Sequence, residues 1–252
     1  MRRFAVDALD VRVFEDDVAL ASAAAHDAGE AIRTALLERD GANVMFAAGV
    51  SQLIFLDVLM SLGGIDWPRV TAFHMDEYVG LPSGHPESLQ TFMRDRVATR
   101  ISLRGFHFMI GDAPDAKSEA ARYGRVLREH PLDLCCLGIG VNGHLAFNDP
   151  HVADFGDRLD AKVVELDEAS RLQQVDEGHF ATFGDVPERA ITVTIPALMR
   201  ARCLIALAMG SRKAEPVHSA LKGVVGAACP ASALRRHPHA TLYLDAAAAS
   251  LV

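Results

Sequence analysis

The chain is poor in cysteine, in basic charge and in long apolar runs, and each shortage argues against a class of protein. It has 4 cysteines in 252 residues and no C-x-x-C pair, so neither a disulfide framework nor a cysteine-ligated metal site is expected. Its 25 basic residues are outnumbered by 33 acidic ones, whereas proteins that bind nucleic acid usually present a basic face. We therefore expect no nucleic-acid partner.

Signal, membrane and linker patterns are missing as well. Residues 1–9 hold two arginines and then turn acidic without a sustained apolar stretch, so we expect no signal peptide, no membrane partner and a cytoplasmic protein. The thiols lie mostly in apolar segments, which is typical of buried free cysteines in a reducing compartment. No repeat or linker divides the chain, and 50% hydrophobic residues suffice for one core. A single domain is expected over residues 1–252.

Short apolar segments alternate with helical patterns along the chain. The expected strands are 44–48, 70–73, 132–137, 162–166, 190–195, 203–209 and 241–244, and the expected helices are 18–37, 53–62, a helix after His85-Pro86-Glu87, 116–129 and the Ala-rich 246–249. This alternation predicts a single Rossmann-like three-layer α/β domain. A mostly parallel sheet would be covered by helices on both faces through right-handed crossovers.

Two of these strands lead into ionisable side chains. Asp76 and Glu77 follow the strand 70–73, at the end where active sites form in open α/β sheets. In a cleft, partial desolvation would raise the pKa of Asp76 toward neutrality and make it a base for proton transfer. The alternative is that Asp76 caps a turn and Glu77 is solvated.

The second segment, Gly138 to Pro150, follows the strand 132–137. Its three glycines allow close backbone approach, and it brings together Asn142, His144 and Asp149. A histidine beside a carboxylate can move protons near neutral pH, although a histidine flanked by Gly143 and leucine can also be a core residue. The glycine pattern lacks the other parts of a dinucleotide fingerprint, so no nucleotide site is expected.

Two further positions suit a phosphate group. Gly49, Val50 and Ser51 lie between a strand and a helix, where backbone N–H groups and the helix dipole favour an anion, although Ser51 could simply cap the helix. Lys213 follows the strand 203–209 and could supply a cation, although a surface lysine would have the same pattern.

Taken together, these segments resemble the glucosamine-6-phosphate deaminase (glucosamine-6-phosphate isomerase) family. The matching segments run in register through nearly the whole chain: Met75 to Leu81, His85-Pro86-Glu87-Ser88, Gly138 to Pro150, Gly210-Ser211-Arg212-Lys213-Ala214 and His237-Pro238. The resemblance implies conversion of glucosamine 6-phosphate and water to fructose 6-phosphate and ammonia in amino-sugar catabolism. No metal or other cofactor is implied, and a homo-oligomer is compatible with such enzymes.

The resemblance also implies residue roles. Asp76 falls on the carboxylate that moves a proton between C2 and C1, and His144, supported by Asn142 and Asp149, falls on the imidazole that assists ring opening. The substrate-binding positions expected are Gly49, Val50, Ser51, Glu77, Gly143 and Lys213.

The chain departs from the family pattern in ways that leave the substrate open. Asn142 stands where some members carry Asp, and Asp149 stands where the family usually has Glu, one methylene longer. The usual phosphate loop with Thr and Pro is here Ala48 to Gln52. Galactosamine 6-phosphate is an alternative substrate, and a 6-phosphogluconolactonase-like hydrolase or a non-catalytic sugar-phosphate sensor are alternative functions.

Overall fold

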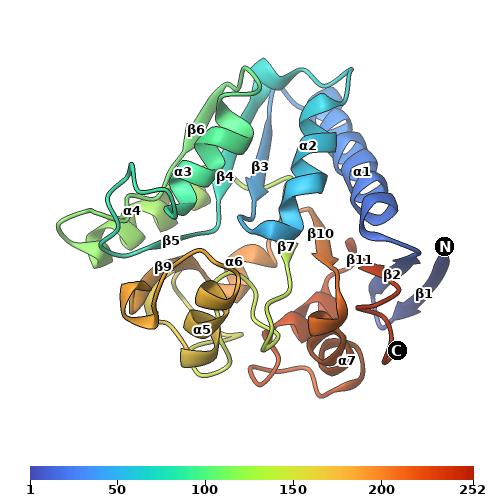
Figure 1. Ribbon diagram of the computed structural model, residues 1–252. Coiled ribbons are helices and arrows are strands. Elements are labelled where there is room, and N and C mark those ends of the chain that lie inside the picture. Colours follow the sequence, from blue (N-terminus) through green and yellow to red (C-terminus); the bar gives the residue numbers. More distant parts are fainter.

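A computed structural model, which describes residues 1–252, contains a large parallel sheet between two layers of helices (Figure 1). The strands are β1 Arg2–Val6, β2 Leu9–Phe14, β3 Ala42–Phe46, β4 Val70–His74, β5 Asp76–Tyr78, β6 Gly105–His107, β7 Leu134–Gly138, β8 Ala161–Glu165, β9 Arg189–Val193, β10 Cys203–Ala208 and β11 Ala240–Asp245. The α-helices are α1 Asp17–Glu38, α2 Leu53–Ser61, α3 Leu89–Met93, α4 Ala116–Glu129, α5 Glu168–Asp176, α6 Ile195–Leu198 and α7 Ala214–Lys222. Shorter helical turns are η1 Val50–Gln52, η2 Trp67–Arg69, the π-helical η3 Arg94–Ala98, η4 Phe183–Asp185, η5 Ser211–Lys213 and η6 Pro230–Arg236.

The main sheet has the strand order β1-β2-β11-β10-β7-β3-β4-β6. All neighbours in it are parallel except the edge pair β1 and β2, which confirms the predicted fold class. From β3 the chain moves outward to β4 and β6, and then returns past β3 to form β7 and β10 on its other side. The gap between β3 and β7 is therefore the topological switch point, where open α/β sheets bind ligands.

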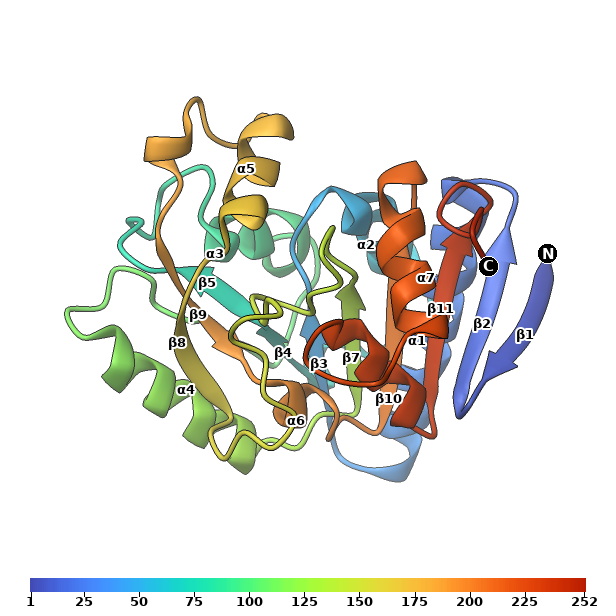
Figure 2. The ribbon, with the colours of Figure 1, turned by 90° about the horizontal axis from the view of Figure 1, so that it is seen from below.

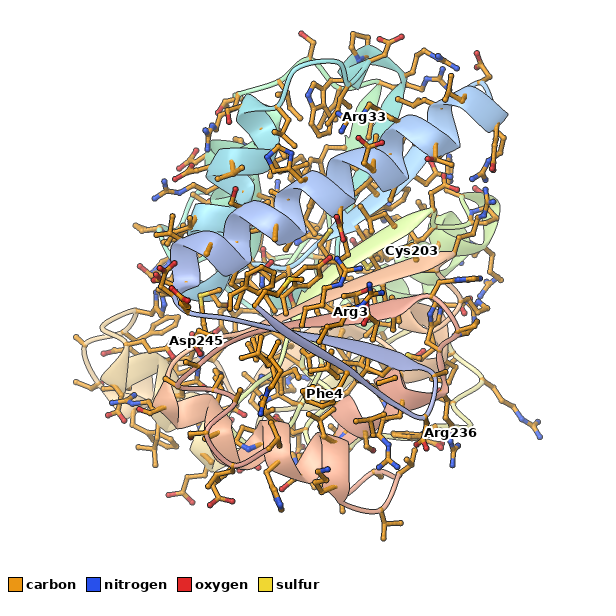
Figure 3. The ribbon with its side chains drawn as sticks, turned by 90° about the vertical axis from the view of Figure 1, so that its right-hand side faces the viewer. Arg3, Phe4, Arg33, Cys203, Arg236 and Asp245 are labelled. Carbon is orange, nitrogen blue, oxygen red and sulfur yellow. The ribbon has the colours of Figure 1, made fainter.

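Alternate residues of each strand enter two separate cores. In β3, Val44 and Phe46 pack with α1 and α2, whereas Met45 packs in the core that contains residues of α4 and α7. Figure 3 shows α1 on one side of the sheet and α7 on the other. This two-residue period is why both faces are covered and why the central strands β3, β7 and β10 are largely apolar.

Two strands lie outside the sheet to which the sequence assigned them. The predicted segments 162–166 and 190–195 do form β8 and β9, but both belong to a small antiparallel sheet of order β5-β9-β8. Figure 2 shows this small sheet on the side of the molecule remote from the N- and C-termini. An apolar strand pattern specifies a buried strand and not its partner, so the expectation that these two strands extend the parallel sheet is wrong.

The two ends of the chain also differ from the prediction. The expected helix over 246–249 is wrong: the segment forms turns, in which the Asp245 side chain accepts a hydrogen bond from the Ala248 amide at 2.7 Å. The hairpin of β1 and β2 was not anticipated, and the Arg2 side chain binds the Val252 carbonyl at 3.1 Å, so the termini lie side by side (Figure 2).

None of the helices is long and apolar enough to cross a membrane. All four cysteines are free; Cys135, Cys136 and Cys229 are buried and Cys203 is half-buried. The expectation of free thiols is thus confirmed.

Candidate active site

The predicted site residues gather at one edge of the sheet because they follow four neighbouring parallel strands. In the order β10-β7-β3-β4, these strands lead into Lys213, the Gly138 to Pro150 loop, Ser51 and Asp76 respectively. Parallel strands have their carboxyl ends on the same edge, so segments more than a hundred residues apart in the chain become neighbours. The site straddles the switch point between β3 and β7.

Asp76 is a buried carboxylate that no hydrogen bond stabilises in its charged form. It begins β5, just beyond the end of β4, and is 8% exposed. Burial and the negative charge of Glu77 raise the pKa of Asp76 to about 8, and no hydrogen bond opposes them. A carboxylate held in this way is a proton acceptor near neutral pH. The alternative assignment of Asp76 as a turn cap is not what the structure contains, because Asp76 pairs with Thr192 of β9.

Glu77 has a different environment from its neighbour. Its carboxylate accepts hydrogen bonds from the Leu89 and Gln90 amides at 3.1 and 2.7 Å and from the Ser88 hydroxyl at 2.8 Å. It is 1% exposed. These contacts occupy the carboxylate oxygens and hold the start of α3, so Glu77 has a positioning role in this structure, and its binding of substrate stays a prediction.

His144 lies in a hydrogen-bonded relay. Its Nδ1 is 2.9 Å from both the Asp149 carboxylate and the Asn142 side-chain oxygen. Because both neighbours are acceptors, the network assigns the proton to Nδ1 and leaves a lone pair on Nε2. The shorter side chain of Asp149 therefore still reaches the imidazole directly.

Asp149 is held in the charged state. Burial raises the pKa of Asp149, but hydrogen bonds from His144, from Asn142 at 2.9 Å and from Ser170 at 2.7 Å outweigh burial and lower the pKa to about 2. The Asn142 amide also donates to Asp167 at 3.3 Å. An aspartate at position 142 would place a third carboxylate between Asp149 and Asp167, which explains why an amide suits this loop.

Two glycines shape the loop around His144. Gly143 has φ of +83°, and a Cβ there would lie 2.7 Å from the Cys229 sulfur. Its amide donates to the Gly140 carbonyl at 3.0 Å and its carbonyl accepts from the Ala231 amide at 2.8 Å. Both backbone groups of Gly143 are therefore used within the protein and shape the loop, and its contact with substrate stays a prediction.

Gly140 leaves the space that the imidazole occupies. A Cβ on Gly140 would lie 2.1 Å from Nε2 of His144 and within 2.3 Å of two further ring atoms. We expect Gly140→Ala to displace the ring and lower kcat on the order of a hundredfold, because a misplacement of about 1 Å can have that effect. The measurement is kcat with circular dichroism as a check on folding. Gly63→Ala is the matched control, since a Cβ on Gly63 meets nothing within 4 Å. Equal activity of the two variants would contradict the role of Gly140 in leaving space for the His144 imidazole.

The turn after β3 lies against the start of the His144 loop. Gly49 has φ of +125°, which favours glycine, and η1 and then α2 follow it. The Ser51 hydroxyl is 3.5 Å from the position that a Cβ on Gly138 would take. Val50 is 57% exposed, so only its backbone can serve a ligand. The predicted anion turn and the catalytic loop are therefore in contact.

Lys213 follows β10, which flanks β7 on the side opposite β3, so Lys213 and the Gly49 to Ser51 turn lie on either side of β7. Gly210, with φ of +87°, starts its turn, and the Gly210 amide donates to both carboxylate oxygens of Asp245, at 3.1 and 3.0 Å. Asp245, labelled in Figure 3, ends the neighbouring strand β11 and so holds the turn in place. Burial lowers the pKa of Lys213, and the Glu177 carboxylate partly opposes this change. The lysine is half-buried.

Two further residues hold the site together and were missed from the sequence. Ser170 of α5 donates to Asp149 and lies 3.4 Å from Nδ1 of His144. Thr192 of β9 pairs with Asp76 and accepts a hydrogen bond from the Phe147 amide at 3.1 Å, so one residue joins the two catalytic segments. Both lie far from those segments in the chain, and no local signal marks them.

Comparison with known proteins agrees with this geometry. A family described as glucosamine-6-phosphate isomerases/6-phosphogluconolactonase matches residues 15–243. A glucosamine-6-phosphate deaminase of Exiguobacterium is 38% identical over 236 residues, which cover 92% of this chain and 90% of that one. One of Listeria monocytogenes is 38% identical over 188 residues, or 75% of this chain and 78% of that one.

Solved structures extend the likeness to three dimensions. A structure described as a monomeric glucosamine-6-phosphate deaminase superposes with a TM-score of 0.88 at 30% identity, over 96% of this chain and 99% of that one. A 6-phosphogluconolactonase from Thermotoga maritima has a TM-score of 0.77 at 18% identity, over 94% of this chain and 99% of that one, and shows a shared fold alone.

Proposed function

Because the chain belongs to the family of glucosamine-6-phosphate isomerases and 6-phosphogluconolactonases, we propose that it is a glucosamine-6-phosphate deaminase. It would convert glucosamine 6-phosphate and water to fructose 6-phosphate and ammonia, in amino-sugar catabolism. The relatives that are 30 to 38% identical carry this name, whereas the solved structures named 6-phosphogluconolactonase are 12 to 19% identical.

One observation carries the proposal: two nearby carboxylates have pKa values shifted in opposite directions. The pKa of Asp76 is raised to about 8 and that of Asp149 is lowered to about 2. Such a separation assigns an exchanging proton to one carboxylate and a permanent charge to the other. An aldose-to-ketose conversion needs this combination, with an imidazole beside the fixed charge.

In the proposed mechanism His144 opens the sugar ring. Its Nε2 takes the proton of the C1 hydroxyl and delivers it to the ring oxygen, while the bond between C1 and that oxygen breaks. Asp149 remains ionised and stabilises the imidazolium that forms during the transfer.

Asp76 then carries out the isomerisation. Its carboxylate removes the proton from C2, and the electron pair passes into an enediol-type intermediate that carries the amino group, as the aldehyde oxygen takes up the proton that the C2 ammonium group of the substrate gives up. Asp76 returns its proton to C1, which leaves an iminium at C2. Water adds there, and the carbinolamine releases ammonia and leaves the ketone of fructose 6-phosphate.

The substrate phosphate would be held by the turn from Gly49 to Ser51 and by Lys213, one on each side of β7. Anchoring this end keeps C1 and C2 at the reacting groups. We expect Lys213→Ala to raise KM by about tenfold to a hundredfold, the range for a lost hydrogen bond between charged groups, with a smaller change in kcat. Steady-state kinetics tests this, and Arg212→Ala, in the same turn but exposed, is the control. An unchanged KM for Lys213→Ala would contradict the phosphate assignment.

The direct test of function measures ammonia and fructose 6-phosphate together. We expect the wild type to form both in equal amounts from glucosamine 6-phosphate. Galactosamine 6-phosphate and 6-phosphogluconolactone complete the panel: preferential turnover of either would replace the proposed substrate or reaction, and binding without turnover of any would indicate a sensor.

The remaining proposals concern the state of the protein in the cell. The four free cysteines suit a reducing cytoplasm. A homo-oligomer and the monomer described for the solved relative predict different masses, which analytical ultracentrifugation distinguishes.

A further inference from the structure

Gln52 is a buried polar side chain without a full set of partners. It is the last residue of η1, directly after Ser51, and it is 1% exposed. Its Oε1 is buried and has no hydrogen-bond partner, while its Nε2 lies 3.4 Å from the Ser51 hydroxyl oxygen. A buried amide oxygen left in this way is unfavourable, and proteins rarely keep one without a use.

The carboxamide extends toward the catalytic loop. A Cβ on Gly138 would lie 3.5 Å from Nε2 of Gln52, the same distance as from the Ser51 hydroxyl. Gly138 is the last residue of β7, so the carboxamide stands over the glycine from which the His144 loop departs. It therefore lies between the phosphate turn and the proton-transfer groups, at the switch point of the sheet.

A bound phosphosugar would complete the hydrogen bonding of this side chain. Nε2 donates to Ser51 and so leaves the Ser51 hydroxyl proton available to the phosphate, whereas Oε1 can accept only from a donor that the protein does not supply. A phosphate at neutral pH offers few protons, but a sugar hydroxyl is such a donor. A sugar anchored at the phosphate turn and reaching His144 would pass this position.

We propose that Gln52 is a specificity-determining residue whose Oε1 accepts a hydrogen bond from a hydroxyl of the phosphosugar. This inference rests on the proposed function for the identity of the sugar and adds a contact on the substrate itself. A site that hydrogen-bonds a hydroxyl discriminates strongly against ligands that lack it.

The test separates sugar recognition from phosphate binding. Glucosamine 6-phosphate and inorganic phosphate are titrated by calorimetry into Asp76→Asn protein, which we expect to turn the sugar over on the order of a thousandfold more slowly than the wild type, with and without the further change Gln52→Met. We expect Gln52→Met to weaken binding of the sugar phosphate about tenfold, the effect of one hydrogen bond, and to change the affinity for inorganic phosphate less than about twofold.

Two other binding results would overturn the inference, and they can be told apart. Equal loss for both ligands would mean that Gln52 acts on the phosphate alone, and no loss for either would give it a structural role only. If Gln52→Met fails to fold, Gln52→Asn, which withdraws the carboxamide by one methylene, is expected to give the same selective loss. Binding without turnover in the wild type would remove the proposed function but leave this contact, whereas no binding of the sugar phosphate would remove both.

Discussion

Asp76→Asn is expected to lower kcat by on the order of a thousandfold and to leave KM nearly unchanged. The loss lies within the range for removal of a general acid–base group, and the amide keeps the shape of the carboxylate. The measurement is steady-state formation of ammonia and fructose 6-phosphate. Asp95→Asn, an exposed aspartate at the start of η3, is the matched control and should retain full activity. A loss of tenfold or less in Asp76→Asn would remove Asp76 from the chemical step.

The pH profile should report the same carboxyl group. Asp76 acts as a base only when deprotonated, and its pKa in the free protein is raised to about 8. We therefore expect kcat/KM to fall about tenfold for each pH unit below 8 and to level off above it. A plateau that extended down to pH 5 would contradict the raised pKa.

Asp76→Asn should also stabilise the protein, relative to the wild type, at high pH. The pKa of Asp76 is about 8 in the folded state, against 3.8 as the reference for an exposed aspartate. Its contribution to stability is fully present below the unfolded pKa and is lost as pH rises through about 8. The Tm advantage of Asp76→Asn over the wild type should thus grow between pH 4 and pH 8 and then remain constant. A lower Tm for the variant at pH 9 would contradict this.

His144→Gln is expected to lower kcat by on the order of a hundredfold to a thousandfold, because glutamine cannot pass a proton from the C1 hydroxyl to the ring oxygen. Asp149→Asn should give a loss of similar size, since the amide cannot stabilise the imidazolium. The two residues act through one hydrogen bond of 2.9 Å. The double variant should therefore be little worse than His144→Gln alone.

Asp149 also has a stability signature opposite to that of Asp76. Its pKa is lowered to about 2, so its contribution to stability is present above pH 4 and is lost as pH falls toward 2. Asp149→Asn should have a lower Tm than the wild type at pH 7, and the difference should vanish in acid.

The exposed His239 provides the control His239→Gln, which should leave kcat and Tm unchanged. Additive losses in the double variant would indicate that His144 and Asp149 work independently.

Much of the fold follows from local pattern. The segments 44–48, 70–73 and 203–209 are short apolar runs, and they form β3, β4 and β10 to within two residues at each end. The helix predicted over 116–129 is α4 with the same bounds, because Asp115 caps it and an apolar stripe recurs at helical spacing. Period and capping are properties of neighbouring residues, so they can be recognised before the chain folds.

The placement of the candidate site also follows in part from which residues come directly after the strands. An ionisable residue that directly follows a buried parallel strand lies at the ligand-binding edge, whichever strands are neighbours. The position of Asp76, His144, Ser51 and Lys213 at this edge was therefore predictable, and the resemblance to a known family joined them to one proposed reaction.

Tertiary structure alone decided which carboxyl groups are charged and which buried polar atoms lack a hydrogen-bond partner. Glu77 and Asp76 are adjacent buried carboxylates, yet several hydrogen bonds lower the pKa of Glu77 and none lowers that of Asp76. Ser170 and Thr192 enter the site from α5 and β9, and Gln52 is left with an unpartnered oxygen. Hydrogen bonding, burial and electrostatic shifts depend on distances between residues remote in the chain, which no periodicity records. The sequence specifies the strands and the residue types at their ends, and only the packed molecule assigns each side chain its partner and its proton.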